Sequence, residues 1–213
     1  IVGQKQNRVL DLSVLVPAGT AAPIGVSCVE QGRWGAPRAS KRSKRHAPTD
    51  LRFTAAQALR SSPSGSYKQQ EVWRRVEQYE AQLRIKSDTS ALEDAFVARD
   101  ADVSELVAGT TPLRDQCGVV IAIGGRVRGL DCFDKPETLA AYWDGLCAGY
   151  ALDAVAAATG TGDATEPPTV ADVSAFVDRA VQAAGTGRGE PSGMGTWRRF
   201  GDDRLVGHAL DWD

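Results

Sequence analysis

The chain has 213 residues, of which 42% are hydrophobic and 24% charged, and its formal net charge is −2. A chain of this length can bury one sizeable core, so we expect a single compound domain over residues 1–213. A net charge so close to zero gives no general attraction to nucleic acid or to a membrane surface. No apolar run approaches the roughly 20 residues of a membrane-spanning helix. We therefore expect a cytoplasmic protein without a membrane partner.

Both ends of the sequence are abrupt. The chain opens with Ile1-Val2-Gly3 and closes at Asp213, within an apparent strand. An Ile-Val-Gly start is typical of activated chymotrypsin-like proteases, but the Gly-Asp-Ser-Gly nucleophile motif is absent, and neither His46 nor His208 has a suitable context. We therefore expect a chain truncated at both ends and not a protease.

Two segments near the start, residues 5–16 and 21–30, are rich in Val, Leu and Ile and are predicted to be strands. Pro17-Ala18-Gly19-Thr20 separates them as a turn. Polar side chains gather at one end of each segment, followed by a tryptophan: Lys5, Gln6, Asn7, Arg8, Glu30, Gln31, Arg33 and Trp34.

Residues 35–50 have almost no large apolar side chains and no periodicity, so they are predicted to form a mobile basic loop. Eight basic residues and one acidic residue lie between positions 33 and 60. Contact with nucleic acid would depend on phosphates, but no aromatic residue interleaves with the basic ones over 35–50 for base stacking. A solvated loop, or one that closes over an anionic ligand, is favoured over a nucleic-acid partner.

Helical signals follow this loop. Residues 51–59 and 67–85 carry apolar residues at helical spacing. A third helix is predicted from a capping box formed by Ser90 and Glu93. A fourth begins at Pro136, where Asp134 and Glu137 match another box, and it continues to about residue 159.

The remaining elements complete a mixed fold. Gly124-Gly125 can supply the two positive φ angles of a tight turn, so residues 117–133 are predicted to form a β-hairpin. A helix after Pro167 and strands over 196–200 and 205–212 follow, with a glycine-rich turn over 185–195. The order is not the alternating pattern of a doubly wound fold. We therefore predict an α+β fold: an antiparallel β-sheet or sandwich core with a central helical section, a β-hairpin and further helices.

Five short motifs occur together along almost the whole chain: Gly3-x-Lys5-Gln6-Asn7-Arg8-Val9, Ser27-Cys28-Val29-Glu30-Gln31-Gly32-Arg33-Trp34, Gln70-x-Val72-Trp73, Gly129-Leu130-Asp131-x-Phe133 and Pro136-Glu137-Thr138-Leu139. This combination resembles the ARG and rhodanese-phosphatase-superfamily-associated protein domain family, where ARG means ADP-ribosylglycohydrolase. The resemblance implies an association with NAD and ADP-ribose metabolism, with ADP-ribose-processing enzymes as partners. The resemblance assigns no catalytic residues to the chain.

The polar cluster at the two strand ends suggests an anion-binding pocket. An arginine fork offers two parallel donors to a phosphate or carboxylate, which suits Arg8 and Arg33. The alternative is a structural network in which Glu30 pairs with an arginine across adjacent strands. The predicted ligand-binding residues are Lys5, Gln6, Asn7, Arg8, Gln31, Arg33 and Trp34.

Three functional hypotheses remain open, and whether the protein is an enzyme stays open with them. The first is an accessory module that binds an anionic nucleotide or phosphoribosyl ligand. The second is a hydrolase or transferase acting on an ADP-ribose-type substrate, with Glu30 or Asp131 as the catalytic acid–base group. The third is a non-catalytic protein-interaction scaffold. No metal or dinucleotide-binding motif occurs in the sequence, so we predict no cofactor.

Overall fold

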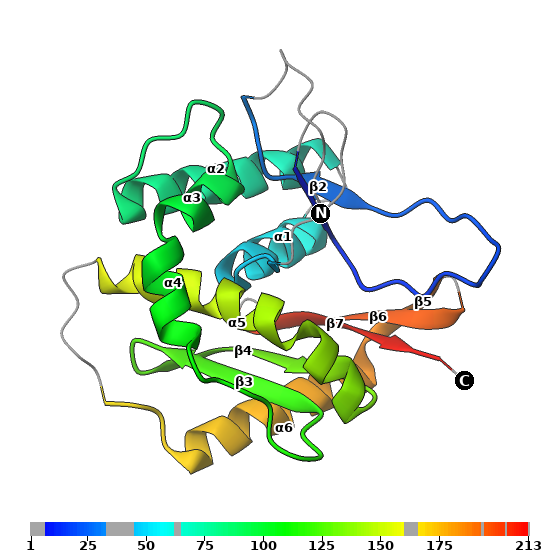
Figure 1. The fold of residues 1–213 in the computed structure, drawn as a ribbon. Helices are drawn as coiled ribbons and strands as arrows, with labels where there is room; N and C mark the ends of the chain where they lie inside the picture. Colours follow the sequence, from blue (N-terminus) through cyan, green and yellow to red (C-terminus); the bar gives the residue numbers. More distant parts are fainter. Residues whose placement is uncertain are drawn as a thin grey trace.

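Figure 1 shows the computed structural model, which describes residues 7–32, 45–61, 65–159, 166–192, 194–202 and 204–212. In this part of the chain two strands are followed by four helices, a hairpin, two further helices and three strands. The strands pair only in antiparallel fashion. The predicted α+β class is therefore confirmed.

Helices supply most of the core. Five helices contribute to it: α1 (Thr49–Ser61), α2 (Gly65–Leu83), α3 (Leu92–Ala98), α4 (Asp100–Val107) and α5 (Pro136–Ala158). The largest apolar cluster draws on all five helices. On α2 the predicted apolar stripe is buried: Val72, Val76, Tyr79 and Leu83. Packing of such a stripe is what stabilises an otherwise charged helix.

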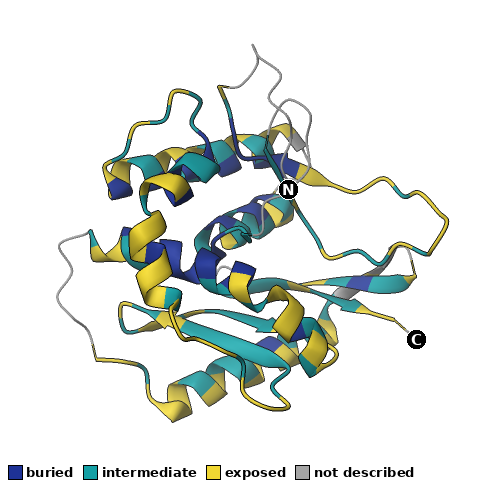
Figure 2. Ribbon diagram, viewed as in Figure 1, coloured by how far each residue is buried: buried dark blue, intermediate teal, exposed yellow. Residues whose placement is uncertain are grey.

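Helix α5 is the central element of the fold, between helices α1–α4 and a β-hairpin (Figures 1 and 2). One side of α5 joins the main cluster. Its other side forms a second apolar cluster, in which buried residues of the helix, Leu139, Leu146 and Tyr150, pack against the hairpin. This two-sided burial explains why α5 has few charged residues.

The hairpin consists of β3 (Gly118–Ile123) and β4 (Arg126–Cys132). Gly124 and Gly125 join the strands with φ angles of +58° and +71°. Two positive φ angles are what a type I′ turn requires, so the predicted hairpin is confirmed.

The first two strands are much shorter than predicted. β1 (Arg8–Leu10) and β2 (Val26–Cys28) are three-residue strands that pair with each other. Pairing ends just past Asp11, whose N–H donates to the carbonyl oxygen of Gly25. Pro17 and Pro23 in the connecting segment have no N–H to give to a longer ladder. The predicted boundaries 5–16 and 21–30 were therefore wrong for the described residues.

The last sheet contains β5 (Arg188–Ser192), β6 (Gly195–Gly201) and β7 (Val206–Asp211) in that order, with α6 (Val170–Thr186) packed against it. The two predicted C-terminal strands are confirmed. β5 lies inside the segment 185–195, where a turn was predicted. A Cβ on Gly189 would lie 2.9 Å from Thr196 Cγ2, so this glycine serves close strand pairing.

The predicted capping boxes at Ser90 and Asp134 were wrong. The N-cap residues of α3 and α5 are Ala91 and Lys135, and neither makes a side-chain capping bond. The Ala91 N–H instead donates to Ser87 Oγ. At α5, Pro136 occupies the first turn and needs no acceptor for its nitrogen.

The expected basic loop is only partly described. Residues 35–44 lie outside the described residues, whereas Thr49 and Asp50 already belong to α1. Across the described segments, no helix combines the length and apolarity needed to cross a bilayer.

Candidate functional site

Glu30 lies in a polar cluster at the end of the first strand pair. Only 4% of the residue is exposed. Its carboxylate accepts hydrogen bonds from the Asn7 backbone N–H (3.1 Å) and the Thr89 hydroxyl (3.2 Å). Asn7 and Glu30 are therefore brought together, as the closeness of the two strands predicted. A buried carboxylate with such donors is equally suited to a structural role.

The other residues of the early cluster are only partly described. Arg8 pairs with Cys28 across the β1–β2 ladder, and the Gln31 N–H donates to the Ser90 carbonyl oxygen. Lys5, Gln6, Arg33 and Trp34 lie outside the described residues. The ligand-binding role of this set, and the acid–base role of Glu30, stay predictions.

Asp131 lies in a different polar cluster, between β4, α1 and α5. The Arg52 guanidinium donates to both carboxylate oxygens, at 2.6 Å and 2.8 Å. The Tyr150 hydroxyl donates to one of the same oxygens. The described partners of Asp131 and of Glu30 thus come from separate elements, and the structure places the two predicted acid–base groups in separate networks.

The electrostatics of this second network fix the charge of Asp131. Burial alone would raise the pKa of its carboxyl, but the hydrogen bonds and charge of Arg52, together with Tyr150, lower that pKa overall. Burial and the Asp131 charge both raise the pKa of Tyr150. Asp131 is therefore a permanent anion near neutral pH, which suits a group that orients its neighbours.

Two glycines allow the elements of this network to approach one another. A Cβ on Gly129, two residues before Asp131, would lie 2.7 Å from Thr49 Cγ2 at the start of α1. A Cβ on Gly149 of α5 would lie 3.2 Å from the carbonyl oxygens of both His46 and Ala47. The segment before α1 consequently crosses directly over α5.

His46 is drawn into the electrostatics of the same network. Burial lowers the pKa of its imidazole, Arg52 lowers it further, and Asp131 opposes them. The ring also makes an edge-to-face contact with Tyr142, with centroids 5.3 Å apart. A loop histidine that was expected to be solvated is therefore half-buried beside an ion pair.

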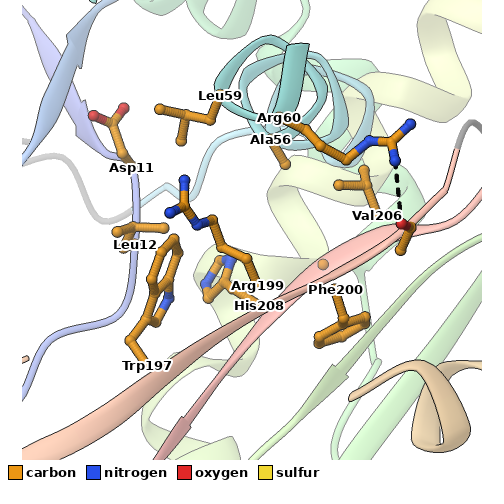
Figure 3. A pocket seen from close by; sticks show the side chains of 12 residues that line it. Asp11, Leu12, Ala56, Leu59, Arg60, Trp197, Arg199, Phe200, Val206 and His208 are labelled. Atoms are coloured by element: carbon orange, nitrogen blue, oxygen red, sulfur yellow. Dashed lines mark hydrogen bonds between the residues drawn. The ribbon is translucent and has the colours of Figure 1, made fainter. Parts of the chain in front are cut away.

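A cavity of about 350 Å³ lies between α1 and the strands β6 and β7 (Figure 3). Helix α1 supplies Ala56, Leu59 and Arg60 to its wall. The sheet supplies larger side chains on the opposite wall, among them Trp197, Arg199, Val206 and His208. The segment after β1 closes the rim with Asp11 and Leu12.

The cavity carries cationic side chains from both walls. Arg60 donates to the Gly201 carbonyl oxygen at 3.3 Å. The Arg199 guanidinium lies 5.2 Å from the centre of the Trp197 ring, in cation–π contact. Asp11 is the carboxylate at the rim, and it accepts from Ser27 Oγ and pairs with Lys68. Lys68 thus balances the charge of this rim carboxylate.

His208 connects the cavity to the Asp131 network. Burial lowers the pKa of its imidazole, the charge of Arg52 lowers it further, and the charge of Asp131 raises it. Arg52 lies one helical turn before Ala56 on α1, so the ion pair is a neighbour of the cavity wall. His208 lies on the edge strand β7 and lines the cavity.

Sequence reasoning gave no binding role to the cavity residues Arg60, Trp197, Arg199 and His208, or to Arg52 and Tyr150 of the neighbouring network. A faint signal was present on α1, where positions 52, 56, 59 and 60 share one helical face with arginine at both ends. On β6, Trp197 and Arg199 are two residues apart and so lie on the same face. Throughout the described ranges, no three His, Cys, Asp or Glu side chains are grouped to hold a metal ion.

The fold and the cavity together define an α+β protein with an arginine-lined pocket beside a buried ion-pair network. The chain belongs to the ARG and Rhodanese-Phosphatase-superfamily-associated Protein domain family, whose sequence profile matches residues 1–213, and the resemblance seen in its motifs is confirmed. The family name indicates an association with ADP-ribosylglycohydrolases and with the rhodanese-phosphatase superfamily. Searches among curated proteins and among solved structures gave no significant match.

Proposed function

We propose that the protein is an accessory module of ADP-ribose and NAD metabolism that binds a small anionic ligand in the cavity between α1 and β6–β7. The observation that carries this proposal is the presence of Arg60, Arg199 and His208 in one cavity. The family association supports a ligand of the nucleotide or phosphoribosyl class. A cytoplasmic location and a partnership with ADP-ribose-processing enzymes belong to the same proposal.

The physical chemistry of the cavity suits such a ligand. Guanidinium groups recognise phosphate oxygens through parallel donors. The apolar surface of Leu12, Leu59 and Val206 lowers the local polarity, which strengthens a charged contact. The volume of about 350 Å³ is at the lower end of the range of roughly 300–1,000 Å³ for small-molecule sites. A mononucleotide or a sugar phosphate is the size we expect.

Binding is favoured over catalysis. A general acid or base needs a pKa close to the working pH and an oxygen that can reach the substrate. Arg52 and Tyr150 donate hydrogen bonds to the Asp131 carboxylate and keep its pKa low. The Asn7 N–H and the Thr89 hydroxyl donate hydrogen bonds to the Glu30 carboxylate. Both carboxylates are thus bonded in ways that suit support of the fold.

The test is calorimetry of the folded protein with ribose 5-phosphate, AMP and ADP-ribose. We expect at least one to bind and Arg199→Gln to weaken it by roughly 10-fold or more, because a hydrogen bond to a charged group contributes about 1.5–3 kcal/mol. Arg179→Gln is the matched control, since Arg179 lies over the Phe176 ring on α6 and does not line the cavity. If Arg8→Gln abolishes binding and Arg199→Gln does not, the early cluster is the site and the cavity proposal fails.

A further inference from the structure

We infer that the indole N–H of Trp197 donates a hydrogen bond to the neutral imidazole of His208, and that this contact leaves His208 with one N–H donor for a ligand of the cavity. Trp197 is then a positioning residue, because it acts on a ligand only through His208. The contact itself does not depend on the proposed function, whereas its consequence for a ligand rests on that function.

The indole of Trp197 has an unused hydrogen-bond donor. Only 5% of the residue is exposed, and its Nε1 is buried without a hydrogen-bond partner among the described residues. Buried donors without an acceptor destabilise a fold and are rare in native proteins. The Arg199 guanidinium lies 5.2 Å from the centre of the indole ring. A cation in that place attracts the π electrons of the ring, which makes the N–H a stronger donor.

The imidazole of His208 is the acceptor next to this donor. The two ring centres are 6.0 Å apart, within the range of neighbouring aromatic rings, and 39° separates the ring planes. In the β6–β7 ladder Trp197 pairs with Leu210 and Arg199 pairs with His208. His208 is therefore the diagonal neighbour of Trp197 on one face of the sheet. Figure 3 shows the two side chains next to each other on that wall of the cavity.

The His208 ring can turn toward the indole. Its nitrogens have no hydrogen-bond partner in the part of the chain that the structure describes. The residue is exposed, since it lines the cavity. Rotation of an exposed side chain is fast and meets little resistance. A small rotation therefore suffices to bring a ring nitrogen of His208 to the Trp197 N–H.

The surroundings of His208 keep its imidazole neutral near pH 7. The protein around the ring disfavours the charged form and lowers its pKa, the charge of Arg52 lowers that pKa further, and Asp131 opposes them. The other charged side chains that border the cavity are Asp11, Arg60 and Arg199. Helix α6 also packs against β7, and its charged residues are exposed: Asp172, Asp178 and Arg179.

The contact fixes the tautomer of His208. In a neutral imidazole one nitrogen is an acceptor and the other carries the hydrogen. The nitrogen that faces Trp197 has to be the acceptor, so the nitrogen on the far side of the ring carries the N–H. Because His208 lines the cavity, this N–H is a donor for an oxygen acceptor of a ligand, such as a phosphate, carboxylate or hydroxyl oxygen.

The experiment is nitrogen-15 NMR of the full chain without ligand, between about pH 5 and pH 8. We expect the ratio of the two neutral His208 tautomers to change roughly 5-fold between wild type and Trp197→Phe, since a net hydrogen bond contributes about 1 kcal/mol. The Trp197 indole proton should move to higher field as His208 becomes protonated, because an imidazolium accepts no hydrogen bond. His208→Phe should abolish this movement. His46→Gln should leave it unchanged, because His46 does not line the cavity.

Thermal unfolding establishes that each variant is folded. If Trp197→Phe does not fold, the movement of the indole proton in wild type and its loss in His208→Phe decide the question. An unchanged tautomer ratio in folded Trp197→Phe overturns the inference, and so does an indole proton that does not follow the protonation of His208. These measurements need no ligand, so their failure leaves the proposed function in place. Absence of binding in the calorimetric screen overturns that function and leaves the contact between the two side chains intact.

Discussion

Arg52 of α1 and Asp131 of β4 form a bidentate ion pair that ties the helical layer to the β-hairpin. The two residues are 79 positions apart in the chain. Tyr150 of α5 adds a third donor, so three elements meet at one carboxylate. The charges of both residues also act on the pKa of His208, which lines the cavity, so the pair is electrostatically coupled to the candidate site.

The first prediction concerns this pair. Asp131→Asn should lower the free energy of unfolding at pH 7 by roughly 1–3 kcal/mol, since it leaves the Arg52 charge without its anion in a partly buried place. Urea unfolding measures the change, with exposed Asp178→Asn on α6 as the control. The pKa of Asp131 is lowered in the folded state, so its stabilisation is present above the unfolded pKa of about 4 and is lost as the pH falls through the folded value. Equal stability of wild type and variant at pH 7 would show that the pair contributes nothing.

The second prediction concerns the glycine that lets the His46 segment cross α5. Gly149→Ala should lower the melting temperature, because the new methyl group would lie 3.2 Å from two backbone carbonyl oxygens. Gly185→Ala on α6 is the matched control, since nothing lies within 4 Å of its added Cβ. That control should gain roughly 0.5–1 kcal/mol from helix propensity. A stabilising effect at both positions would contradict the tight crossing.

The third prediction concerns Asp153, a buried carboxyl on α5. It accepts hydrogen bonds from the Tyr79 hydroxyl and the Asp50 N–H. Burial raises its pKa to about 6, and although the Tyr79 bond opposes this, the Asp50 charge adds to it. Since the unfolded pKa is about 4, the folded state holds the proton more tightly, and the contribution of Asp153 to stability falls as the pH rises from about 4 to 6.

Asp153→Asn removes this titration. We expect the stability of the variant relative to wild type to improve by about 2–3 kcal/mol between pH 4 and pH 7, at about 1.4 kcal/mol per pKa unit. Chemical unfolding at several pH values measures it, with Asp178→Asn again as the exposed control. Parallel pH profiles for wild type and Asp153→Asn would disprove the raised pKa.

The fourth prediction concerns the pH dependence of anion binding. His208 lines the cavity, and its protonated form adds a positive charge there. Burial and the charge of Arg52 lower the pKa of its imidazole. Sulfate keeps its charge over this pH range, so its affinity should rise several-fold as the pH falls from 7.5 to 5.5. His208→Gln should abolish the rise. His46→Gln should retain it, because His46 has a lowered pKa but does not line the cavity.

Local signals explain which parts of the fold could be predicted. The Gly124-Gly125 turn and the apolar stripe of α2 depend on neighbouring residues, and both predictions were confirmed. The early strands were predicted too long because their hydrophobic content suggested pairing that their prolines and polar contacts do not allow. Capping boxes were misplaced because a three-residue spacing matches by chance at many positions.

The candidate site depends on contacts that one sequence does not reveal. Asn7 and Glu30 could be predicted as neighbours because their strands are close in sequence. The cavity joins Leu12, α1 and His208, which only the packed fold brings together. In the sequence alone, nothing distinguishes Arg52, Arg60 and Arg199 from ordinary surface charges.

The cavity walls come from the segment after β1, from α1 and from the strands β6 and β7 at the end of the chain. A ligand of the proposed site would contact segments that are almost 200 residues apart in sequence. The main apolar cluster contains no residue beyond Trp197, whereas a wall of the cavity is built from that residue onward. Binding at the proposed site would therefore require the final strands to be in place, and such a ligand would report completed folding.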